Sequence, residues 1–411
     1  MAFQGTTRRM NPLDLLAYRK VSSVCFEYPF AYEGDAQAFY DENKASSAES
    51  FEKSMKHLHH KYVAEYDGQI VAGLADYPYQ INFDGQTQRM SGIGGVCSHP
   101  SYRRLGAVRA LFRHMLADAQ ADGTEWSVLY PFSQTYYEKF GYALSEPAQE
   151  WSFSLRHVAP LSNDSYSFSL HEGGTEGLED FAAAYARMTG SNMMVQRETC
   201  DFSKVIYANP YKKNDFAYLC RDADGVPRGY AIWHKETEAG ALIMQMTELV
   251  FDGMPALRAI LRFAATFTSH YDILRFEAPS HLNLEALCTD FATGQVHRRL
   301  RTHSMMRVVH TENALRGAAL QGSGEAVLHI DDPGLTRQHN LALRWRDGQL
   351  TDIGNTGLAP DAELAVGTFS ALLLGRYNAS DFPYLNGAAF ARPDKLTGLF
   401  YKKAIDLKNS F

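Results

Sequence analysis

The sequence predicts an α+β protein made of two copies of one structural unit, followed by a smaller α+β domain. Residues 60–132 and 215–278 both show the order strand–strand–strand–helix–strand, so the pattern repeats although the letters do not. Turn residues become frequent after about residue 305, and this change in composition indicates the start of a third domain. A chain of 411 residues is also too long for one ordinary hydrophobic core.

Composition and charge exclude several functional classes. Hydrophobic residues make up 45% and charged residues 21% of the chain, and its formal net charge is -7. No overall basic field exists that would attract a nucleic acid or an anionic membrane, so we expect neither partner. The five cysteines include no CxxC pair, and no apolar run is long enough to span a bilayer. A cytoplasmic protein without metal is therefore expected.

The first repeat begins after a helical segment over residues 12–26 and a polar, alanine-rich stretch. Asp67-Gly68 and Asp84-Gly85 mark tight turns between three extended runs. The later elements are a helix over 103–123 that ends at Gly123, a strand over 126–132, a short helix over 133–140 and a strand with apolar positions at Trp151, Phe153 and Leu155.

The second repeat follows the same order in the middle of the chain. Its expected elements are a helix over 180–190, a hairpin about Asp224-Gly225 over 217–236, a strand over 241–251, a helix over 255–270 and a strand over 272–279. In the last part we expect a hairpin over 341–350 and an amphipathic helix over 361–376. The expected domains are therefore residues 1–150, 151–304 and 305–411.

The segment GIGGVCSHPSYRRLGAVRALF, residues 92–112, carries the chemistry. It places the end of a strand, two arginines and Gly106 directly before a long helix. A helix N-terminus offers unpaired amides and a partial positive charge, and a glycine there lets the backbone approach a phosphate. Arg103 and Arg104 add charge-assisted contacts to a pyrophosphate. Alone, such a motif is more often a capped surface helix with solvated arginines.

The surrounding order favours the ligand site. The pattern R/Q-x-x-G-x-(G/A) after a strand, followed by helix, strand and a tyrosine ahead of F-G-Y, resembles the GNAT acetyltransferase superfamily. The combination HPSYRRLGAVRAL and YPFSQTYYEKFGY is more narrowly similar to the Eis (enhanced intracellular survival) family. That resemblance implies tandem GNAT folds, with mixed and largely antiparallel sheets flanked by helices. It also implies a sterol-carrier-protein-like last domain and a homo-oligomer, either a hexamer or a trimer.

The resemblance further implies an acetyl-CoA-dependent N-acetyltransferase with particular site residues. The residues implied to bind acetyl-CoA are Val96, Ser98, Arg103, Arg104, Gly106, Ala107 and Val108. Tyr137 would be the general acid that reprotonates the CoA thiolate, and the α-carboxylate of Phe411 would be the base. A free α-carboxylate has a reference pKa of about 3.5, so burial or a water relay would have to assist it. A backbone amide in the Gly94–Val96 segment would polarise the thioester carbonyl.

Two departures from the family pattern bear on specificity. Val108 stands where many GNAT proteins have glycine or alanine. Ser410 occupies the penultimate position, where some members carry an acidic residue that binds polyamines. The second repeat reads Asp252-Gly253-Met254-Pro255 between strand and helix, and this acidic junction without arginine would repel a diphosphate. We expect the second repeat to be structural.

The acceptor is expected to be a primary amine on a polyamine-like molecule, an aminoglycoside or a lysine. Aromatic and acidic residues between positions 26 and 40 either form a local core or line an amine pocket. The residues considered for this pocket are Phe26, Phe30, Tyr32, Asp35 and Tyr40. Two alternatives remain: a non-enzymatic sensor of acyl-CoA or lipid, and the same fold with a longer acyl donor. Cys97 is expected to pack rather than react, and the histidines at 57, 59 and 60 to be solvated.

Overall fold

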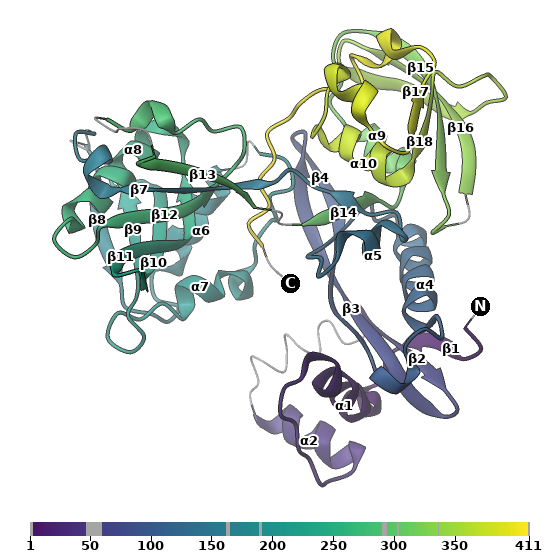
Figure 1. Ribbon diagram of the computed structural model, residues 1–411, viewed down its shortest axis with the longest axis horizontal. Coiled ribbons are helices and arrows are strands. Elements are labelled where there is room, and N and C mark those ends of the chain that lie inside the picture. Colours follow the sequence, from purple (N-terminus) through teal and green to yellow (C-terminus); the bar gives the residue numbers. More distant parts are fainter. Residues whose placement is uncertain are drawn as a thin grey trace. The chain divides into compact units, whose positions relative to one another are not determined.

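The computed structural model describes residues 3–46, 60–161, 165–188, 191–289, 294–301, 304–335 and 337–409. These residues form three β-sheets with helices packed on them, and the chain divides into two compact units (Figure 1). One unit takes its described residues from 1–145 and 304–402, and the other from 146–303 and 403–409. The division at residues 150 and 304 made from the sequence stays a prediction.

The first sheet has the strand order β1-β2-β3-β4-β5-β14-β6. Its strands are β1 (Thr6–Arg9), β2 (Lys61–Tyr66), β3 (Gln69–Phe83), β4 (Gln86–Ser98), β5 (Trp126–Leu129), β6 (Ala143–Leu144) and β14 (Met305–Val308). Both predicted turns are present, because Asp67-Gly68 and Asp84-Gly85 have the positive φ angles that tight hairpins require. β4 and β5 run parallel, and the helix between them makes the crossover.

Helices cover both faces of this sheet. Tyr62 and Ala64 pack beneath α4 (Ala107–Ala121), whereas Val63 packs with α1 (Leu15–Phe26), as the alternation of side chains along a strand requires. The remaining helices of this part are α2 (Ala36–Ser46) and α5 (Gln134–Glu138). The sequence predicted a helix from residue 103, but α4 begins at Ala107 because Arg104 and Gly106 adopt left-handed backbone angles.

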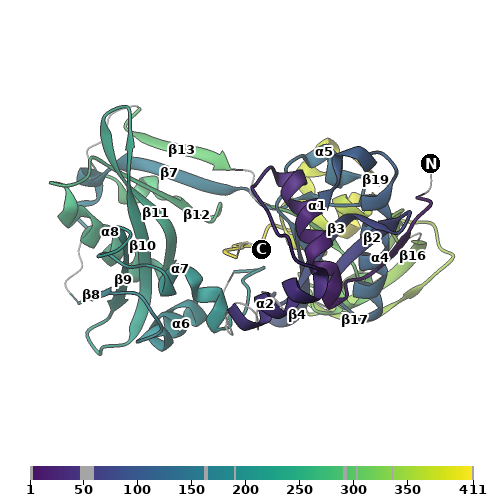
Figure 2. The ribbon, with the colours of Figure 1, turned by 90° about the horizontal axis from the view of Figure 1, so that it is seen from below.

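The second sheet confirms the predicted repeat. Its strands follow the order β13-β7-β12-β11-β10-β9-β8 (Figure 2). β11 and β12 run parallel, as β4 and β5 do in the first sheet. The strands of the second sheet are β7 (Ala148–Ser154), β8 (Ser167–His171), β9 (Asp215–Arg221), β10 (Pro227–Glu238), β11 (Ala241–Phe251), β12 (Ile273–Ala278) and β13 (Val296–Arg301). Its helices are α6 (Leu178–Arg187), α7 (Ser203–Ile206) and α8 (Gly253–Ala264).

One strand in the first sheet comes from far along the chain. β14 lies between β5 and β6, although it follows the whole second repeat in sequence. The strand expected around Trp151 is β7, and it pairs with β12 and β13 in the second sheet. In each sheet the neighbour of the repeat's last strand, β14 beside β5 and β7 beside β12, thus comes from outside the predicted repeat.

The third sheet has the order β17-β16-β15-β18-β19. Its elements are β15 (Gly324–Asp332), β16 (Arg337–Arg346), β17 (Gln349–Asn355), β18 (Ala362–Ala365) and β19 (Ala388–Phe390), with α9 (Thr311–Arg316) and α10 (Val366–Leu374). The helix predicted over 361–376 was too long at its start, because residues 362–365 pair with β15 as a parallel strand.

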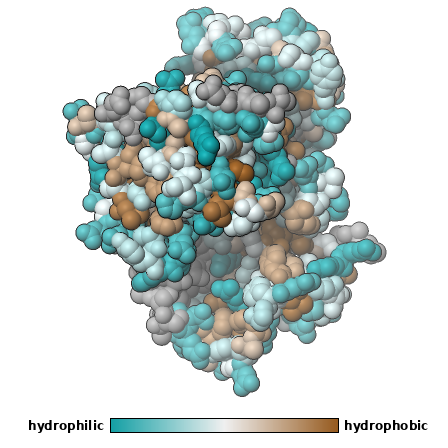
Figure 3. Space-filling view, turned by 60° about the vertical axis from the view of Figure 1, so that its left-hand side comes forward, coloured by the Kyte–Doolittle hydropathy of each residue, from teal (hydrophilic) through white to brown (hydrophobic). Residues whose placement is uncertain are grey.

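Surface hydropathy does not by itself mark a site. Hydrophobic and hydrophilic residues are interspersed on the face that Figure 3 shows, as is ordinary when apolar atoms supply more than half of a protein surface. Within the described part of the chain, no helix has the length and apolar character needed to cross a membrane.

Candidate active site

An opening between β4 and β5 creates the place where a ligand chain could pair with the sheet. The two parallel strands are in register only from Met90 to Ile93 on β4 and from Trp126 to Leu129 on β5. Beyond Ile93, β4 continues to Ser98 with pairing to β3 alone. The backbone groups of residues 94–98 that face away from β3 are therefore available to an extended ligand.

A bulge interrupts β4 at the start of this opening. The pairing of β3 with β4 shifts between Gly73 and Ala75, and Gly95 has a φ of 57°. A bulge redirects the peptide groups at that point of the strand. This geometry suits the predicted polarising amide in the Gly94–Val96 segment.

α1 holds the bulge from one face of the sheet. The Tyr18 hydroxyl donates a hydrogen bond to the Gly95 carbonyl oxygen at 3.2 Å. A Cβ atom on Gly95 would lie 2.6 Å from the Tyr18 hydroxyl oxygen, so the tyrosine requires glycine at that position. Sequence reasoning did not single out Tyr18, because its helical spacing marked it only as a core position.

The turn after β4 carries the predicted anion motif. A short 3-10 turn, Pro100–Tyr102, leads to Arg104 with a φ of 70° and to Gly106 with a φ of 89°. The first hydrogen bond of α4 runs from the Ala110 amide to the Gly106 carbonyl oxygen, so the amides just before Ala110 have no helical acceptor. Left-handed residues next to a helix start create a concave set of amides that favours an anion.

The general-acid candidate lies against the same helix. Tyr137 on α5 is buried, and its ring packs edge-on against Phe112 of α4 with 6.0 Å between the ring centroids. Burial raises the pKa of the Tyr137 phenol above its ordinary value. The phenol thus keeps its proton at neutral pH, and no group in the described residues is hydrogen-bonded to it.

The aromatic and acidic segment before α2 is divided between packing and exposure. Phe30 and Tyr32 pack against Phe39, with ring centroids 5.8 and 4.8 Å apart. Asp35 accepts a hydrogen bond from the Ala38 amide at 2.8 Å and so serves α2. Phe26 is 52% exposed. These contacts favour the local-core interpretation for Phe30 and Tyr32 over a pocket lining.

The remaining reactive candidates have structural surroundings. Cys97 is buried beneath α1, and desolvation raises the pKa of its thiol to about 12, so it remains protonated. Residues 57 and 59 of the histidine cluster lie outside the described residues. Elsewhere in the described chain no three side chains of the metal-binding types gather in one place.

The corresponding junction of the second sheet is built differently. α8 begins directly after Asp252, whose carboxylate pairs with Arg228 at 2.7 Å. Arg228 also pairs with Asp222 at 2.7 Å. Arg228 is thus shared by two carboxylates, which leaves this helix start net negative and unfavourable for a diphosphate.

The C-terminal tail belongs to the second unit up to Asn409. Two backbone hydrogen bonds join the tail to Asn192. The Asn192 amide donates to the Ala404 carbonyl oxygen, and the Asp406 amide donates to the Asn192 carbonyl oxygen. Arg197, nearly fully buried, donates to the Asn409 side-chain oxygen at 2.7 Å and pairs with Glu248 at 2.5 Å. Ser410 and Phe411 lie outside the described residues. No sequence motif marked Arg197, because its partners are distant in the chain.

Comparisons with known proteins agree with this architecture. Residues 18–145 and 194–308 each match a family model described as "Acetyltransferase (GNAT) domain". The chain is 22% identical over 356 residues to an "Uncharacterized N-acetyltransferase" of Streptomyces avermitilis, a match that covers 82% of this chain and 84% of that one. The chain is therefore an acetyltransferase, and its two repeated units are GNAT domains. Enzymes of this class use acetyl-CoA.

Two solved structures share the fold over nearly the whole length. A GCN5-related N-acetyltransferase from Anabaena variabilis has a TM-score of 0.80 at 21% identity and covers 98% of both chains. Eis1 from Mycobacterium abscessus has a TM-score of 0.78 at 16% identity, covering 99% of this chain and all of that chain. At these identities the likeness shows the fold alone.

Proposed function

We propose that this acetyltransferase is Eis-like and moves the acetyl group of acetyl-CoA directly to a primary amine. One observation carries the proposal: β4 parts from β5 just before a turn in which Arg104 and Gly106 open the amides at the start of α4. An extended thioester arm bearing a diphosphate fits such an arrangement, with the arm on the strand and the diphosphate at the helix start.

Binding of acetyl-CoA follows from these parts. The arm would pair with β4 at Val96 and Ser98, beyond the end of its pairing with β5. The diphosphate would accept hydrogen bonds from amides between Arg103 and Val108. Arg103 and Arg104 are exposed, and their charge would complement the phosphates. The side chain of Val108, the second residue of α4, is half-buried and packs against the core of this unit.

The reaction needs one proton acceptor and one proton donor. The ammonium loses a proton to the base, and the amine nitrogen attacks the thioester carbon. The carbonyl oxygen becomes an oxyanion that a bulge amide stabilises. To become an amide, the nitrogen also releases a second proton, which restores the Tyr137 phenol directly or through water. When the C–S bond breaks, the thiolate takes the phenolic proton of Tyr137. A thiol with a reference pKa of about 8.5 is a stronger acid than tyrosine, so this last transfer depends on the local desolvation of the thiolate.

The α-carboxylate of Phe411 is the proposed base. The sequence resemblance supplies the role itself. Aromatic surroundings would raise the pKa of the carboxyl group toward the range in which it accepts protons efficiently.

The acceptor class is a polyamine-like small molecule, an aminoglycoside or a lysine side chain. Ser410, which lacks a carboxylate, weighs against tight polyamine binding. Phe26 is the exposed aromatic residue of the segment considered for the amine pocket. The sterol-carrier-like character of the last domain, the homo-oligomer and the cytoplasmic location also stay predictions.

A thiol-release assay with a panel of primary amines tests the proposed function. We expect release of CoA from acetyl-CoA that depends on the amine. Binding of CoA without turnover for any amine would instead support the sensor. Faster turnover with a longer acyl-CoA would support the alternative donor.

A further inference from the structure

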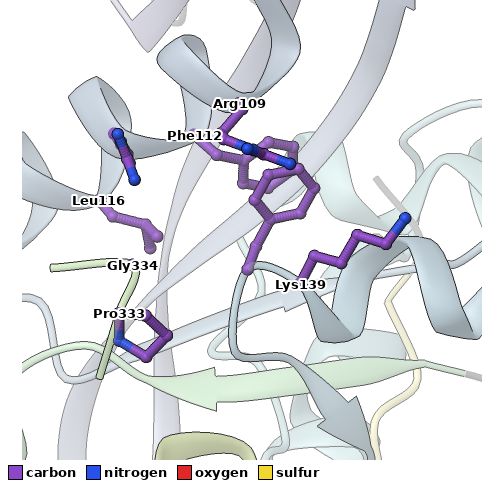
Figure 4. Close-up of a pocket in the computed structure, with 8 residues that line it drawn as sticks. Arg109, Phe112, Leu116, Lys139, Pro333 and Gly334 are labelled. Carbon is purple, nitrogen blue, oxygen red and sulfur yellow. The ribbon is translucent and has the colours of Figure 1, made fainter. Parts of the chain in front are cut away.

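A small basic cavity lies beside the proposed diphosphate cradle. Its volume is about 170 Å³, and all the residues that line it belong to the unit formed by residues 1–145 and 304–402. Figure 4 shows Arg109, Phe112 and Leu116 extending from α4, with Lys139 on the facing segment and Pro333 and Gly334 on a third. The lining residues are Arg109, Phe112, Arg113, Leu116, Lys139, Phe140, Pro333 and Gly334.

The charge of this cavity has one sign. Arg109, Arg113 and Lys139 line it, and no acidic residue does. Among the described residues none of these three cations forms an ion pair, and all three side chains are exposed. Because the whole chain carries a net charge of -7, this cluster does not reflect a generally basic protein. Three unpaired cations at one cavity repel each other, so an anion bound there would be favoured.

The base of the cavity is rigid. The rings of Phe112 and Phe140 stack with centroids 4.3 Å apart and an angle of 11° between their planes. Fully buried Arg307 donates to the Phe140 carbonyl oxygen at 2.5 Å and also pairs with Asp332. Asp332 in turn accepts from the Gly334 amide at 3.1 Å. A single buried arginine thus ties together two of the segments that line the cavity.

The carboxylate of Asp332 is already used by this network. It faces Arg307 and the Gly334 amide and is absent from the cavity lining. Consequently it leaves the positive charge of Arg109, Arg113 and Lys139 uncompensated. The site is therefore prepared for an anion by both its charge and its fixed walls.

The size and place of the cavity restrict the anion. A volume of about 170 Å³ is below the roughly 300 Å³ at which pockets for whole drug-sized ligands begin, so the cavity suits one group of a larger ligand. Arg109 is three residues after Gly106, which corresponds to about 4.5 Å along the helix. In coenzyme A the 5′-diphosphate and a 3′-phosphate monoester are attached to the same ribose, so one phosphate must lie near the other.

We propose that Arg109, Arg113 and Lys139 bind the 3′-phosphate of coenzyme A, an inference that rests on the proposed use of acetyl-CoA. The contact makes the enzyme select nucleotide thioesters that carry this phosphate over otherwise identical ones that lack it. Arg113 on α4 and Lys139 after α5 would contact the same 3′-phosphate from two different segments. They would therefore determine the preference for ligands that carry this phosphate.

Calorimetry with coenzyme A and with dephospho-coenzyme A, which lacks the 3′-phosphate, tests the inference. Wild-type protein should bind coenzyme A about tenfold more tightly or better, as expected for charge-assisted contacts to a phosphate. In Arg113→Gln and Lys139→Gln, and most clearly in the double variant, this preference should fall toward one. Affinity for dephospho-coenzyme A should change little, and Arg316→Gln, an exposed arginine elsewhere in the same unit, should keep the preference.

The outcomes separate this inference from the function on which it rests. Equal binding of the two ligands by wild-type protein, or a preference that persists in the folded double variant, would overturn the 3′-phosphate site alone. Failure of both ligands to bind would overturn the use of acetyl-CoA itself. Inorganic phosphate that binds wild type but not the double variant, without any preference for coenzyme A, would assign the cavity to free phosphate. Circular dichroism of each variant confirms that it is folded.

Discussion

Asp76 gives the unit that contains the first sheet a stability that should fall as pH rises. This residue is buried in β3, and its carboxyl group accepts a hydrogen bond from Ser91. Desolvation raises the pKa of Asp76 from 3.8 to about 7, while the Ser91 hydrogen bond opposes the shift. The folded protein therefore retains a proton that the unfolded chain has already lost above pH 4.

The magnitude follows from this difference in proton affinity. Stability from the Asp76 proton is fully present below about pH 4 and is lost as pH rises through about 7. At about 1.4 kcal/mol for each pH unit, the loss reaches about 4 kcal/mol by pH 8, as an upper bound. Asp76→Asn places a neutral group of nearly the same shape there, so the variant should be increasingly more stable than wild type from pH 4 to pH 7.

Amide hydrogen exchange of peptides from β3 and β4 measures this effect. The method reports the opening free energy of the first sheet by itself, which matters because a multidomain chain does not unfold in one step. Asp67→Asn, in the exposed turn between β2 and β3, is the matched control and should follow wild type. Parallel pH profiles for Asp76→Asn and wild type would refute the buried-proton argument.

Three further predictions concern catalysis. Tyr137→Phe should lower kcat by about a hundredfold or more with CoA affinity nearly unchanged, because it removes a proton donor and little packing; a normal kcat in steady-state assays would exclude Tyr137 as the acid. Extending the chain by a few residues beyond Phe411 should nearly abolish turnover and leave CoA binding intact by calorimetry, since the α-carboxylate is moved; full activity would remove Phe411 from the mechanism. Tyr18→Phe should lower kcat several-fold without affecting CoA affinity, because it deletes one hydrogen bond, worth about 1 kcal/mol, to the Gly95 bulge; a change in KM alone would contradict this positioning role.

The order of strands and helices could be predicted from the sequence because it depends on local signals. Turn dipeptides such as Asp67-Gly68 and Asp224-Gly225 and the helical spacing after Gly106 each act over a few residues. Their repetition in the same order predicted two copies of one structural unit, and the resemblance of the first copy to GNAT acetyltransferases implied which unit it is. The anion motif was equally local, because its glycine and its arginines lie within four consecutive residues.

Contacts between residues far apart in the chain could not be predicted from the sequence. β14 enters the first sheet from residue 305, and no feature of Met305–Val308 indicates which sheet it joins. The same limit applies to the contact of Arg197 with Asn409, which are separated by 212 residues. The start of α10 was misplaced because Ala362–Ala365 has apolar positions that suit either a helix or a short buried strand.

The basic cavity was missed for a related reason. Arg109 and Arg113 are four residues apart on α4, which is an ordinary arrangement for a solvated helix face. Only the folded chain brings Lys139 and the Pro333-Gly334 turn to them.

Calorimetric titration of the purified chain with acetyl-CoA shows directly whether the segment around Gly106 binds this cofactor. We expect saturable binding at one site per chain, because the acidic junction at Asp252 disfavours a second site. Gly106→Asp should weaken it at least tenfold by placing a negative charge at the cradle. Gly68→Asp, at another glycine with positive φ but in an open turn, is the matched control and should bind as wild type does. No binding by the folded wild-type protein, or unchanged affinity in Gly106→Asp, would contradict the account.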